Sequence, residues 1–550
     1  MPLQARIEPA PKPEVKSERL THPGMAPGRP PLAGLARHFH SPAVWGLMAA
    51  CGFAYLMLFI PPFTPIFLGG GDQSCFLLDG MRIAGGQTIY RDFFELLLPG
   101  APILYAGLIE LFGVRAWIPN AALLATATGM AWLSIVIARR MVSGAAIIMP
   151  GLLFLAVSLY ACRDATHHWY SSLLAIAAAA VLIDRSDDAR MAAAGLLLGL
   201  AACFSQNAGV AAIAGLAVFI FWDKGRNGQE WRGLARSEAA FLFPAAAVIA
   251  ICAAWCGLTA GWRNFFSCTI VFPLEYWPKG SENQFSAAMH AVADAASQLL
   301  VRPRPTLLLV LFMTALIPAV YFVAWWVCWR RPAMLSRSRK RALALVAAVG
   351  LSLFASVANS PNLLRLAAVS LPAFLTLAAL MDGFGLLKGG TYAAAWILII
   401  ALAAGAAVRT QASPRQYVNT FSGNIAVVSP DRSAEFYRWL EANTRPGQYV
   451  LDTTWPDVYF SHGLKNPIKL PFLTACGYTP REQARELTAD LSRHDVPLIL
   501  WGSDADPSAD CEPGDDSLDE LRHFLHSRYH RVKAFELGTV SVTAWRKTKM

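Results

Sequence analysis

Long apolar segments separated by short polar loops recur along almost the whole chain, and no water-soluble fold could bury so many of them. We count about eleven segments that approach the roughly 20 apolar residues needed to cross a bilayer as a helix. Hydrophobic residues make up 55% of the chain and charged residues only 15%. The sequence therefore predicts a polytopic α-helical membrane protein. The predicted spans are residues 44–67, 116–138, 143–160, 171–183, 192–204, 209–222, 239–260, 305–329 and 342–357, a tenth that ends near 382, and 393–407.

The positive charges indicate how the chain is threaded through the membrane. Most of the net charge of +10 lies in short loops between the apolar segments, and residues 329–341 form the most basic of these loops. Arg and Lys accumulate in cytoplasmic loops, and a cytoplasmic N-terminus places every dense basic loop inside. This pattern accounts for the charge without a nucleic-acid partner. We expect a multi-pass protein of the bacterial inner membrane whose C-terminal part lies outside the cytoplasm.

The first residues differ from the rest of the chain. Residues 1–42 are rich in Pro, Lys, Arg and Glu and contain no apolar core, so we predict a disordered cytoplasmic arm. They do not resemble a signal peptide, because the first apolar run begins late and continues to span length. The predicted transmembrane domain then covers residues 43–409.

The stretch from Gly69 to Gly113 concentrates charge directly after the first apolar segment. Four acids and two arginines precede Pro99, and such groups are costly at a membrane unless they are solvated or functional. The last part, Pro99–Gly113, is apolar but short for a span and contains Glu110, so we predict an interfacial helix. Residues 67–115 then form a first outer loop, and residues 261–303 form a later one.

The last part of the chain is polar and alternates between two kinds of pattern. Residues 435–443, 480–491 and 517–527 have helical periodicity, whereas residues 448–452, 496–502 and 538–545 are typical of strands. This alternation predicts a small extracytoplasmic α/β domain over residues 410–550.

The ten cysteines contain no CxxC pair, and eight of them lie in or beside apolar segments, where they are expected to be core residues. Only Cys476 and Cys511 lie in the polar C-terminal part. In an extracytoplasmic domain these two thiols could form a disulfide.

One pattern in the first outer loop links the chain to a known family. The loop carries an early acid and then, in order, small, aromatic and proline positions: Asp72, Ala84, Gly86, Tyr90–Phe93 and Pro99–Gly100. This pattern resembles the GT-C superfamily of polytopic glycosyltransferases, in particular the bacterial aminoarabinose–lipid A transferases and the protein O-mannosyltransferases. The resemblance covers residues 44–410. The stretches 192–215, 262–278 and 356–377 follow in the order found in that group.

The resemblance implies an enzyme that moves a sugar from a polyprenyl phosphate or diphosphate to a lipid, glycan or protein acceptor, with inversion at the anomeric carbon. Such a displacement needs a carboxylate that takes the acceptor's proton and cations that stabilise the departing phosphate. Asp72 occupies the place of the superfamily's first-loop acid, so it is the predicted general base. Helix capping or simple solvation is the alternative role for this residue.

Further acids are candidates for a supporting role. Asp92 and Glu95 lie three residues apart and would share one face if they were helical. One of them, or Asp164 in the next outer loop, is a candidate second acid that binds the acceptor or a divalent metal. Pairing with Arg91 is the structural alternative for the first two. Asp79 is typical of an acid on a helix surface.

Arg365 is the leading candidate for binding the donor phosphate, because it is the only charged residue between Arg341 and Asp382 and follows an outer turn. The forked donors of a guanidinium group match phosphate oxygens, although snorkelling to the membrane surface is the structural alternative. The remaining candidates for phosphate binding are Arg163, Arg82, Arg91 and Gln206, the last of which stands where aminoarabinose transferases carry a lysine.

Other polar and aromatic residues of the outer loops receive a structural interpretation. His167 and His168 are sequence neighbours and lack the i, i+4 spacing of metal ligands on a helix, so the sequence does not predict a zinc site there. Tyr276 and Trp277, next to Glu275, are interpreted as an aromatic anchor at the membrane surface.

Two other functions remain open at this point: a transporter or flippase of lipid-linked sugars, and a non-catalytic protein that binds them. The expected partners are a polyprenyl-phosphate-linked sugar donor and membrane lipids. No cofactor is predicted, and a divalent cation is left as an open alternative.

Overall fold

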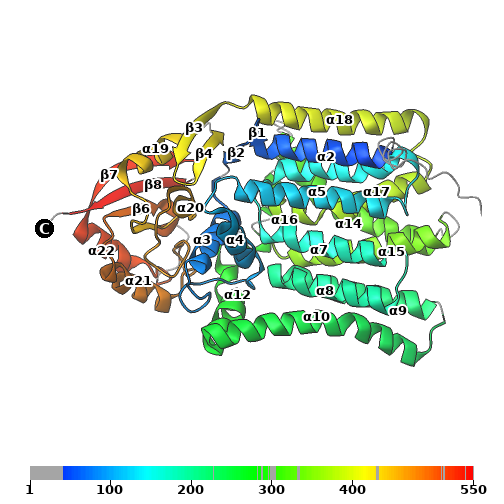
Figure 1. Ribbon diagram of the computed structural model, residues 1–550, viewed down its shortest axis with the longest axis horizontal. Helices are drawn as coiled ribbons and strands as arrows, with labels where there is room; N and C mark the ends of the chain where they lie inside the picture. The colour runs from blue at the N-terminus through cyan, green and yellow to red at the C-terminus, as the bar shows by residue number, and fades with distance from the viewer. Residues whose placement is uncertain are drawn as a thin grey trace, which may run out of the picture.

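The computed structural model describes residues 41–548, apart from residues 68, 227, 281–282, 287–288, 291, 295–296, 298–304, 331–334, 429–432, 509–510, 512–513 and 539. The predicted N-terminal arm therefore lies almost entirely outside the described residues. Figure 1 shows two parts, a bundle of helices along the long axis and a C-terminal α/β domain that covers one end of the bundle.

A helix lies at each position where the sequence predicts a span. Six helices in the described part are long and apolar enough to cross a membrane, or up to seven if the bent pair α16 (Leu363–Val369) and α17 (Leu371–Gly383) is one span. The prediction of a polytopic helical membrane protein is confirmed, with six or seven candidate spans among the described residues where the sequence predicts about eleven. The six are α5 (Ile118–Ala138), α9 (Gln206–Arg226), α10 (Trp231–Ala260), α14 (Pro305–Arg330), α15 (Arg337–Val357) and α18 (Gly389–Ala412). The shorter bundle helices are α2 (Pro42–Leu58), α6 (Met149–Phe154) within the apolar segment Gly144–Leu159, α7 (His167–Leu182) and α8 (Asp188–Phe204).

The first helix is shorter than predicted. It ends at Leu58 and not near Phe67, because the prolines at positions 61, 62 and 65 cannot continue a helix. The chain instead forms the antiparallel pair β1 (Phe59–Ile60) and β2 (Thr64–Phe67).

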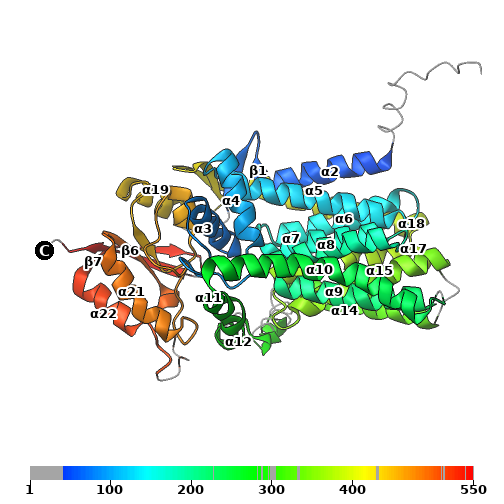
Figure 2. The same cartoon turned by 60° about the horizontal axis from the view of Figure 1, so that its bottom comes forward.

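The first outer loop contains two short helices that lie between the bundle and the C-terminal domain (Figures 1 and 2). They are α3 (Asp72–Ala84) and α4 (Gly100–Phe112), and α4 is too short to be among the candidate spans. Glycine allows them to pack closely, since a Cβ atom on Gly80 would lie 2.8 Å from the Cβ atom of Tyr105. The two helices therefore form a platform at the end of the bundle.

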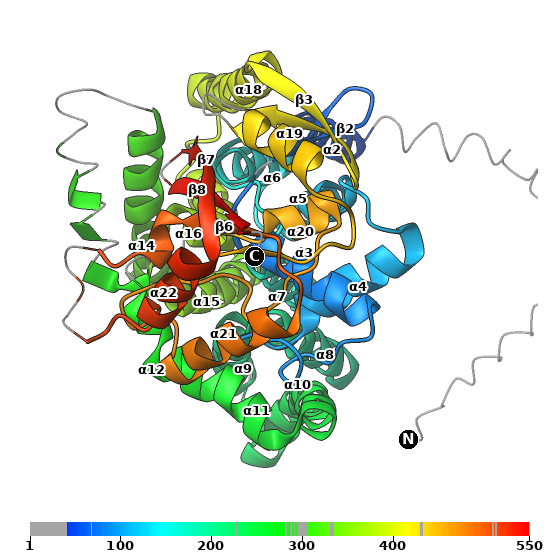
Figure 3. The same cartoon turned by 90° about the vertical axis from the view of Figure 1, so that its left-hand side faces the viewer.

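The C-terminal part is an α/β domain, as predicted. One four-stranded sheet has the order β5-β6-β8-β7, in which β5 and β6 are parallel and the other neighbouring strands are antiparallel. Figure 3, which looks onto this domain from its far side, shows the sheet and its helices in front of the bundle. The elements are β5 (Val450–Asp452), β6 (Leu498–Gly502), β7 (Tyr529–Leu537) and β8 (Val540–Lys547), with α19 (Ser433–Asn443), α20 (Asp457–His462), α21 (Arg481–Arg493) and α22 (Asp519–Arg528).

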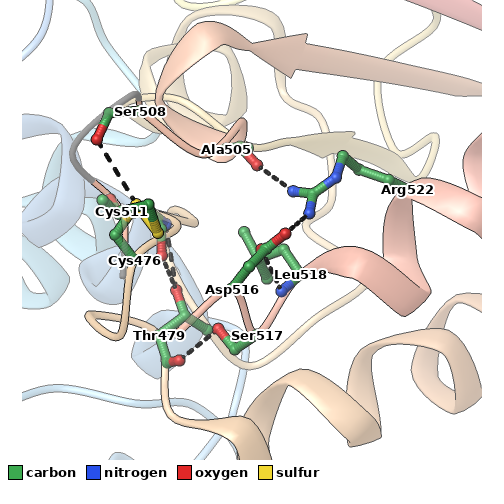
Figure 4. Close-up of a disulfide and its surroundings, with 10 residues drawn as sticks. Cys476, Thr479, Ala505, Ser508, Cys511, Asp516, Ser517, Leu518 and Arg522 are labelled. Atoms are coloured by element: carbon green, nitrogen blue, oxygen red, sulfur yellow. Dashed lines mark hydrogen bonds and ion pairs between the residues drawn. A yellow bond between two sulfur atoms is a disulfide. The ribbon is translucent and has the colours of Figure 1, made fainter. Parts of the chain in front are cut away.

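A disulfide joins Cys476 to Cys511, the pairing that the sequence left open (Figure 4). The segment around it is held by further contacts, because Ser517 donates a hydrogen bond of 2.7 Å to the carbonyl of Thr479 and Arg522 pairs with Asp516. The disulfide, the hydrogen bond and the ion pair together connect the loops before α21 and before α22.

A second sheet combines strands from the two ends of the chain. β3 (Arg415–Thr420) and β4 (Gly423–Val428) form a hairpin, and β2, which follows α2 and β1, pairs in parallel with β4, so that Ile66 lies beside Ala426. The strand order is β1-β2-β4-β3. The C-terminal domain is therefore joined to the membrane part by main-chain hydrogen bonds as well as by side chains.

Basic loops meet at the opposite end of the bundle, away from the C-terminal domain (Figure 1). Arg140 pairs with Asp184 at 2.6 Å, and Arg341 pairs with Asp223 at 2.9 Å while also donating to the carbonyl of Ile183. These ion pairs bring together loops that are far apart in the sequence. The bundle thus has one end rich in arginine and another end covered by the α/β domain.

Candidate active site

Asp72 is the first residue of α3, which lies between the bundle and the C-terminal domain (Figure 1). Gly70 and Gly71 precede it with φ angles of 82° and 90°, a conformation that glycine adopts easily. The side chain of Asp72 is 36% exposed, and a carboxylate at a helix N-terminus is stabilised by the helix dipole. The glycine turn therefore presents an accessible carboxyl group at the start of a helix.

Asp164 lies next to Asp72, as the sequence predicts for a supporting acid. The backbone N–H of Gln73 donates to its Oδ1 atom at 3.2 Å, and the backbone N–H of Ala165 donates to the side chain of Gln73 at 2.9 Å. A Cβ atom on Gly71 would lie 2.4 Å from Oδ2 of Asp164, so only glycine fits there. Burial, and then the charge of Asp72, raises the pKa of Asp164 well above its ordinary value.

His167 and His168 also belong to this cluster, although they are sequence neighbours without the i, i+4 spacing of metal ligands on a helix. The Nδ1 atom of His167 lies 3.7 Å from a carboxylate oxygen of Asp72. The two imidazole rings lie side by side with their centroids 3.9 Å apart, and ligand atoms of both histidines and of Asp72 lie within 4.8 Å of one another. The spacing rule considers ligands on the face of a regular helix, whereas these residues form the first turn of α7.

Arg365 reaches the same cluster from α16. Its guanidinium group donates to the carbonyl of Ser360 at 3.1 Å and to Oδ1 of Asn283 at 3.2 Å, and it lies over the ring of Trp277. It also interacts electrostatically with both histidines of the cluster. The leading phosphate ligand therefore lies near the two histidines, one of which faces the predicted base. Trp277 packs against Arg365 in addition to its predicted anchoring role.

Asp457 is a site residue that the sequence analysis missed. It begins α20 in the C-terminal domain and accepts a hydrogen bond of 2.6 Å from the backbone N–H of Gly70. Burial raises the pKa of Asp457 to about 7. The only sequence signal is the run Trp455–Asp457 between a strand and a helix, which does not indicate contact with the first outer loop.

The structure buries Asp79 and Glu95 together, which corrects two predictions. Asp79 is only 1% exposed and is not a helix-surface acid, and Glu95 lies in an irregular segment and does not share a helical face with Asp92. Burial, then the charge of Glu95, raises the pKa of Asp79, and burial also raises the pKa of Glu95. Burial thus disfavours the charged form of both carboxyl groups.

The other residues predicted for the site bind partners outside the cluster of Asp72, Asp164 and the two histidines. Arg82 is buried and donates to the carbonyls of Ile468 and Lys469, so it fastens α3 to the C-terminal domain. The Asp92 carboxylate pairs with the exposed Arg91 at 2.9 Å, as the structural alternative predicts for that pair. The other two side chains contact main-chain carbonyls: Arg163 donates to Met57, and Gln206 donates to Leu96.

The raised pKa of Asp79 predicts a pH-dependent effect on stability. The folded state keeps the Asp79 proton, whereas the unfolded chain loses it above about pH 4, so this carboxyl destabilises the fold as pH rises. An Asp79→Asn variant cannot ionise and should melt a few degrees higher than the wild type at pH 8, with the difference disappearing near pH 4. Thermal unfolding in detergent measures this shift. The matched control is Asp92→Asn, whose carboxyl has a lowered pKa and should give no gain. Lower stability of Asp79→Asn than of the wild type at pH 8 would contradict the raised pKa of Asp79.

Comparisons with known proteins find a similar fold among solved structures. No family model matches the chain, and no curated protein matches it. The crystal structure of ArnT from Cupriavidus metallidurans in the apo state superposes with a TM-score of 0.55 at 15% sequence identity, covering 93% of this chain and 98% of that chain. The structure of the same protein bound to undecaprenyl phosphate matches at 14% identity over the same shares with a TM-score of 0.44, which is too loose to compare the folds. The predicted resemblance is therefore confirmed for the fold, and the chain is similar to ArnT in its fold over 93% of its length.

Proposed function

We propose that this chain is an inverting glycosyltransferase that moves a sugar from a polyprenyl phosphate or diphosphate to an acceptor outside the cytoplasm. The observation that carries the proposal is the convergence of Asp72, Asp164 and Arg365, from three separate segments, where the bundle meets the C-terminal domain. Carboxylates and a guanidinium group at one end of a membrane bundle are the groups that this reaction needs.

In this mechanism, Asp72 takes the proton of the acceptor's hydroxyl group while the acceptor oxygen attacks the anomeric carbon. The bond between that carbon and the carrier's phosphate oxygen breaks in the same step, which inverts the configuration. Arg365 stabilises the negative charge that develops on the departing phosphate. Asp164 holds the turn before Asp72 and lines the acceptor side.

The lipid carrier is proposed from the fold and from the chemistry of the site. ArnT from Cupriavidus metallidurans, whose apo form has a similar fold, has also been solved with undecaprenyl phosphate. The guanidinium group of Arg365 lies at the end of a membrane helix bundle, where it could reach a phosphate attached to a lipid chain. We therefore take an undecaprenyl-type phosphate as the carrier, with a lipid, glycan or protein as the acceptor.

The orientation of the chain follows the same proposal. In the proposed topology all eleven predicted segments cross the membrane, so the arginine-rich end of the bundle is cytoplasmic and the α/β domain is extracytoplasmic, as expected for a bacterial inner-membrane enzyme. The disulfide between Cys476 and Cys511 fits an oxidising compartment. The site then opens on the side where lipid-linked sugars would be used.

Labelling of single cysteines tests this orientation. Ser338 and Ser492 are both exposed, the first near the basic loop and the second on α21 of the C-terminal domain. A membrane-impermeant maleimide added to intact cells should label Ser492→Cys strongly and Ser338→Cys no more than the unsubstituted chain, until the membrane is opened. Labelling of Ser338→Cys in intact cells would overturn the orientation.

A transfer assay tests the function itself. Purified protein in vesicles is incubated with undecaprenyl phosphate that carries a labelled sugar, from a panel of sugars, and with membrane lipids as acceptors. The proposal predicts that label moves to a new product and that its anomeric configuration is inverted. Label that crosses the bilayer on its carrier would favour a flippase, and label that is bound without transfer would favour a non-catalytic binder; both outcomes contradict the proposal.

A further inference from the structure

A cavity lies between the ends of α15, α17 and α18 at the arginine-rich end of the bundle, which is the end away from the C-terminal domain (Figure 1). Its volume is about 580 Å³, within the range of cavities that hold small ligands. The polar side chains that line it are those of Ser143, Arg339, Asp382, Lys388 and Tyr392. We propose that this cavity binds the head group of an anionic phospholipid. The proposal does not rest on the proposed sugar transfer, because none of these residues belongs to the candidate active site.

Arg339 is a cation of the cavity that the fold holds in a fixed orientation. Its Nη1 atom donates to Oδ2 of Asp382 at 2.8 Å, and its Nη2 atom donates to Oγ of Ser143 at 2.8 Å. A guanidinium group has five N–H donors, so these two bonds leave three for a ligand. The side chain of Arg339 is 34% exposed. Its forked donors are therefore both oriented and accessible, and this geometry matches the oxygens of a phosphate group.

Lys388 gives the cavity its excess of positive charge, because the carboxylate of Asp382 offsets the charge of Arg339. Lys388 is exposed directly before the first residue of α18, and its ammonium group forms no ion pair among the described residues. The loop that carries it is held in place, since Oγ1 of Thr391 donates to the carbonyl of Lys388 at 2.8 Å. Two cations thus face one anion in the lining of the cavity, which favours a negatively charged ligand.

The surface next to the cavity indicates that the anion is attached to a lipid. Only 11% of the most apolar part of α18 is buried, the lowest share among the six candidate spans of the described part, and Ile397 and Ile400 are 68% and 59% exposed. Tyr392 lines the cavity and packs edge-on against Trp396, and such aromatic residues are typical of the level of lipid head groups. A phosphate in the cavity would therefore place its acyl chains along the apolar face of α18. Basic pockets between transmembrane helices bind anionic lipids in this way.

Lipid binding to the purified full chain in detergent tests the proposal. Native mass spectrometry counts the bound molecules during a titration with phosphatidylglycerol, and a parallel titration with phosphatidylcholine measures a lipid without net charge. The wild type should hold one phosphatidylglycerol more tightly than phosphatidylcholine. Lys388→Ala should weaken this binding about fivefold, the contribution of one basic side chain near anionic lipid. Adding Arg339→Gln to Lys388→Ala should weaken it about 25-fold in total and remove the preference for phosphatidylglycerol.

The matched control removes a cation from the same end of the bundle but outside the cavity. Arg232 is exposed in the first turn of α10, and Arg232→Ala should bind phosphatidylglycerol like the wild type. Thermal unfolding shows which variants are folded, and the exposed position 388, as Lys388→Ala or Lys388→Glu, supplies the test if the double variant does not fold. Equal affinity for phosphatidylglycerol in the wild type and in the folded Lys388 variants would overturn the proposal. Displacement of the lipid by an equal concentration of inorganic phosphate would also overturn it, because the cavity would then recognise a free anion.

Discussion

Replacing Asp72 with asparagine is expected to slow sugar transfer by about 10²–10⁴-fold, the range that a general base typically contributes. Asparagine has nearly the same shape and keeps the position at the start of α3, where the side chain is 36% exposed. It cannot accept the acceptor's proton. The rate constant for transfer at saturating donor should therefore fall, whereas the affinity for the undecaprenyl-phosphate sugar should change little.

The control for this prediction comes from the same loop. Asp92 is an acid whose carboxylate pairs with Arg91 outside the cluster, so Asp92→Asn should transfer sugar at nearly the wild-type rate. Wild-type rates in Asp72→Asn would remove it from the reaction.

Removing the guanidinium group of Arg365 is expected to weaken donor binding by about 30-fold or more. Truncating one partner of a desolvated, hydrogen-bonded charge pair costs roughly 2–5 kcal/mol, and each 1.4 kcal/mol corresponds to about tenfold in affinity. Arg365→Lys should retain part of the affinity, because lysine keeps the charge but not the forked geometry. Binding of undecaprenyl phosphate to the purified variants measures this effect directly.

The fold of the Arg365 variants must be checked alongside donor binding. Arg365 also bonds to Ser360 and Asn283, so its loss could loosen the loops that these residues belong to. Arg91→Ala, which removes an exposed guanidinium group with 54% exposure, is the matched control and should leave donor affinity unchanged. Unaltered donor affinity in a folded Arg365→Ala variant would exclude this side chain from the phosphate site.

Much of the fold follows from local sequence patterns. Apolar stretches predict the bundle helices, strand-like runs predict β6 and β8, and helical periodicity predicts α21. The end of the first helix was placed too late, because hydrophobicity outweighed the three prolines that follow Leu58. Local patterns thus identify elements well and place their boundaries less well.

The candidate site is only partly predictable, because its members come from distant segments. Asp72 and Arg365 stand out as charges beside apolar runs, and their convergence agrees with that reading. Asp457 carries no such signal, since its role depends on its contact with Gly70 across most of the chain. Likewise, the predicted helical face of Asp92 and Glu95 is wrong because Tyr90, with a φ of 67°, belongs to an irregular turn.

The parallel pairing of β2 with β4 has a consequence for how the protein is made. β2 leaves the ribosome after one membrane helix, whereas β4 follows the last of them, so the two strands can meet only near the end of synthesis. Contacts between distant segments also form late in folding. The turn before Asp72 therefore reaches its final contacts only after β4 and Asp457 have been synthesised. A nascent chain stalled before β4 would therefore carry every membrane helix and still be catalytically silent.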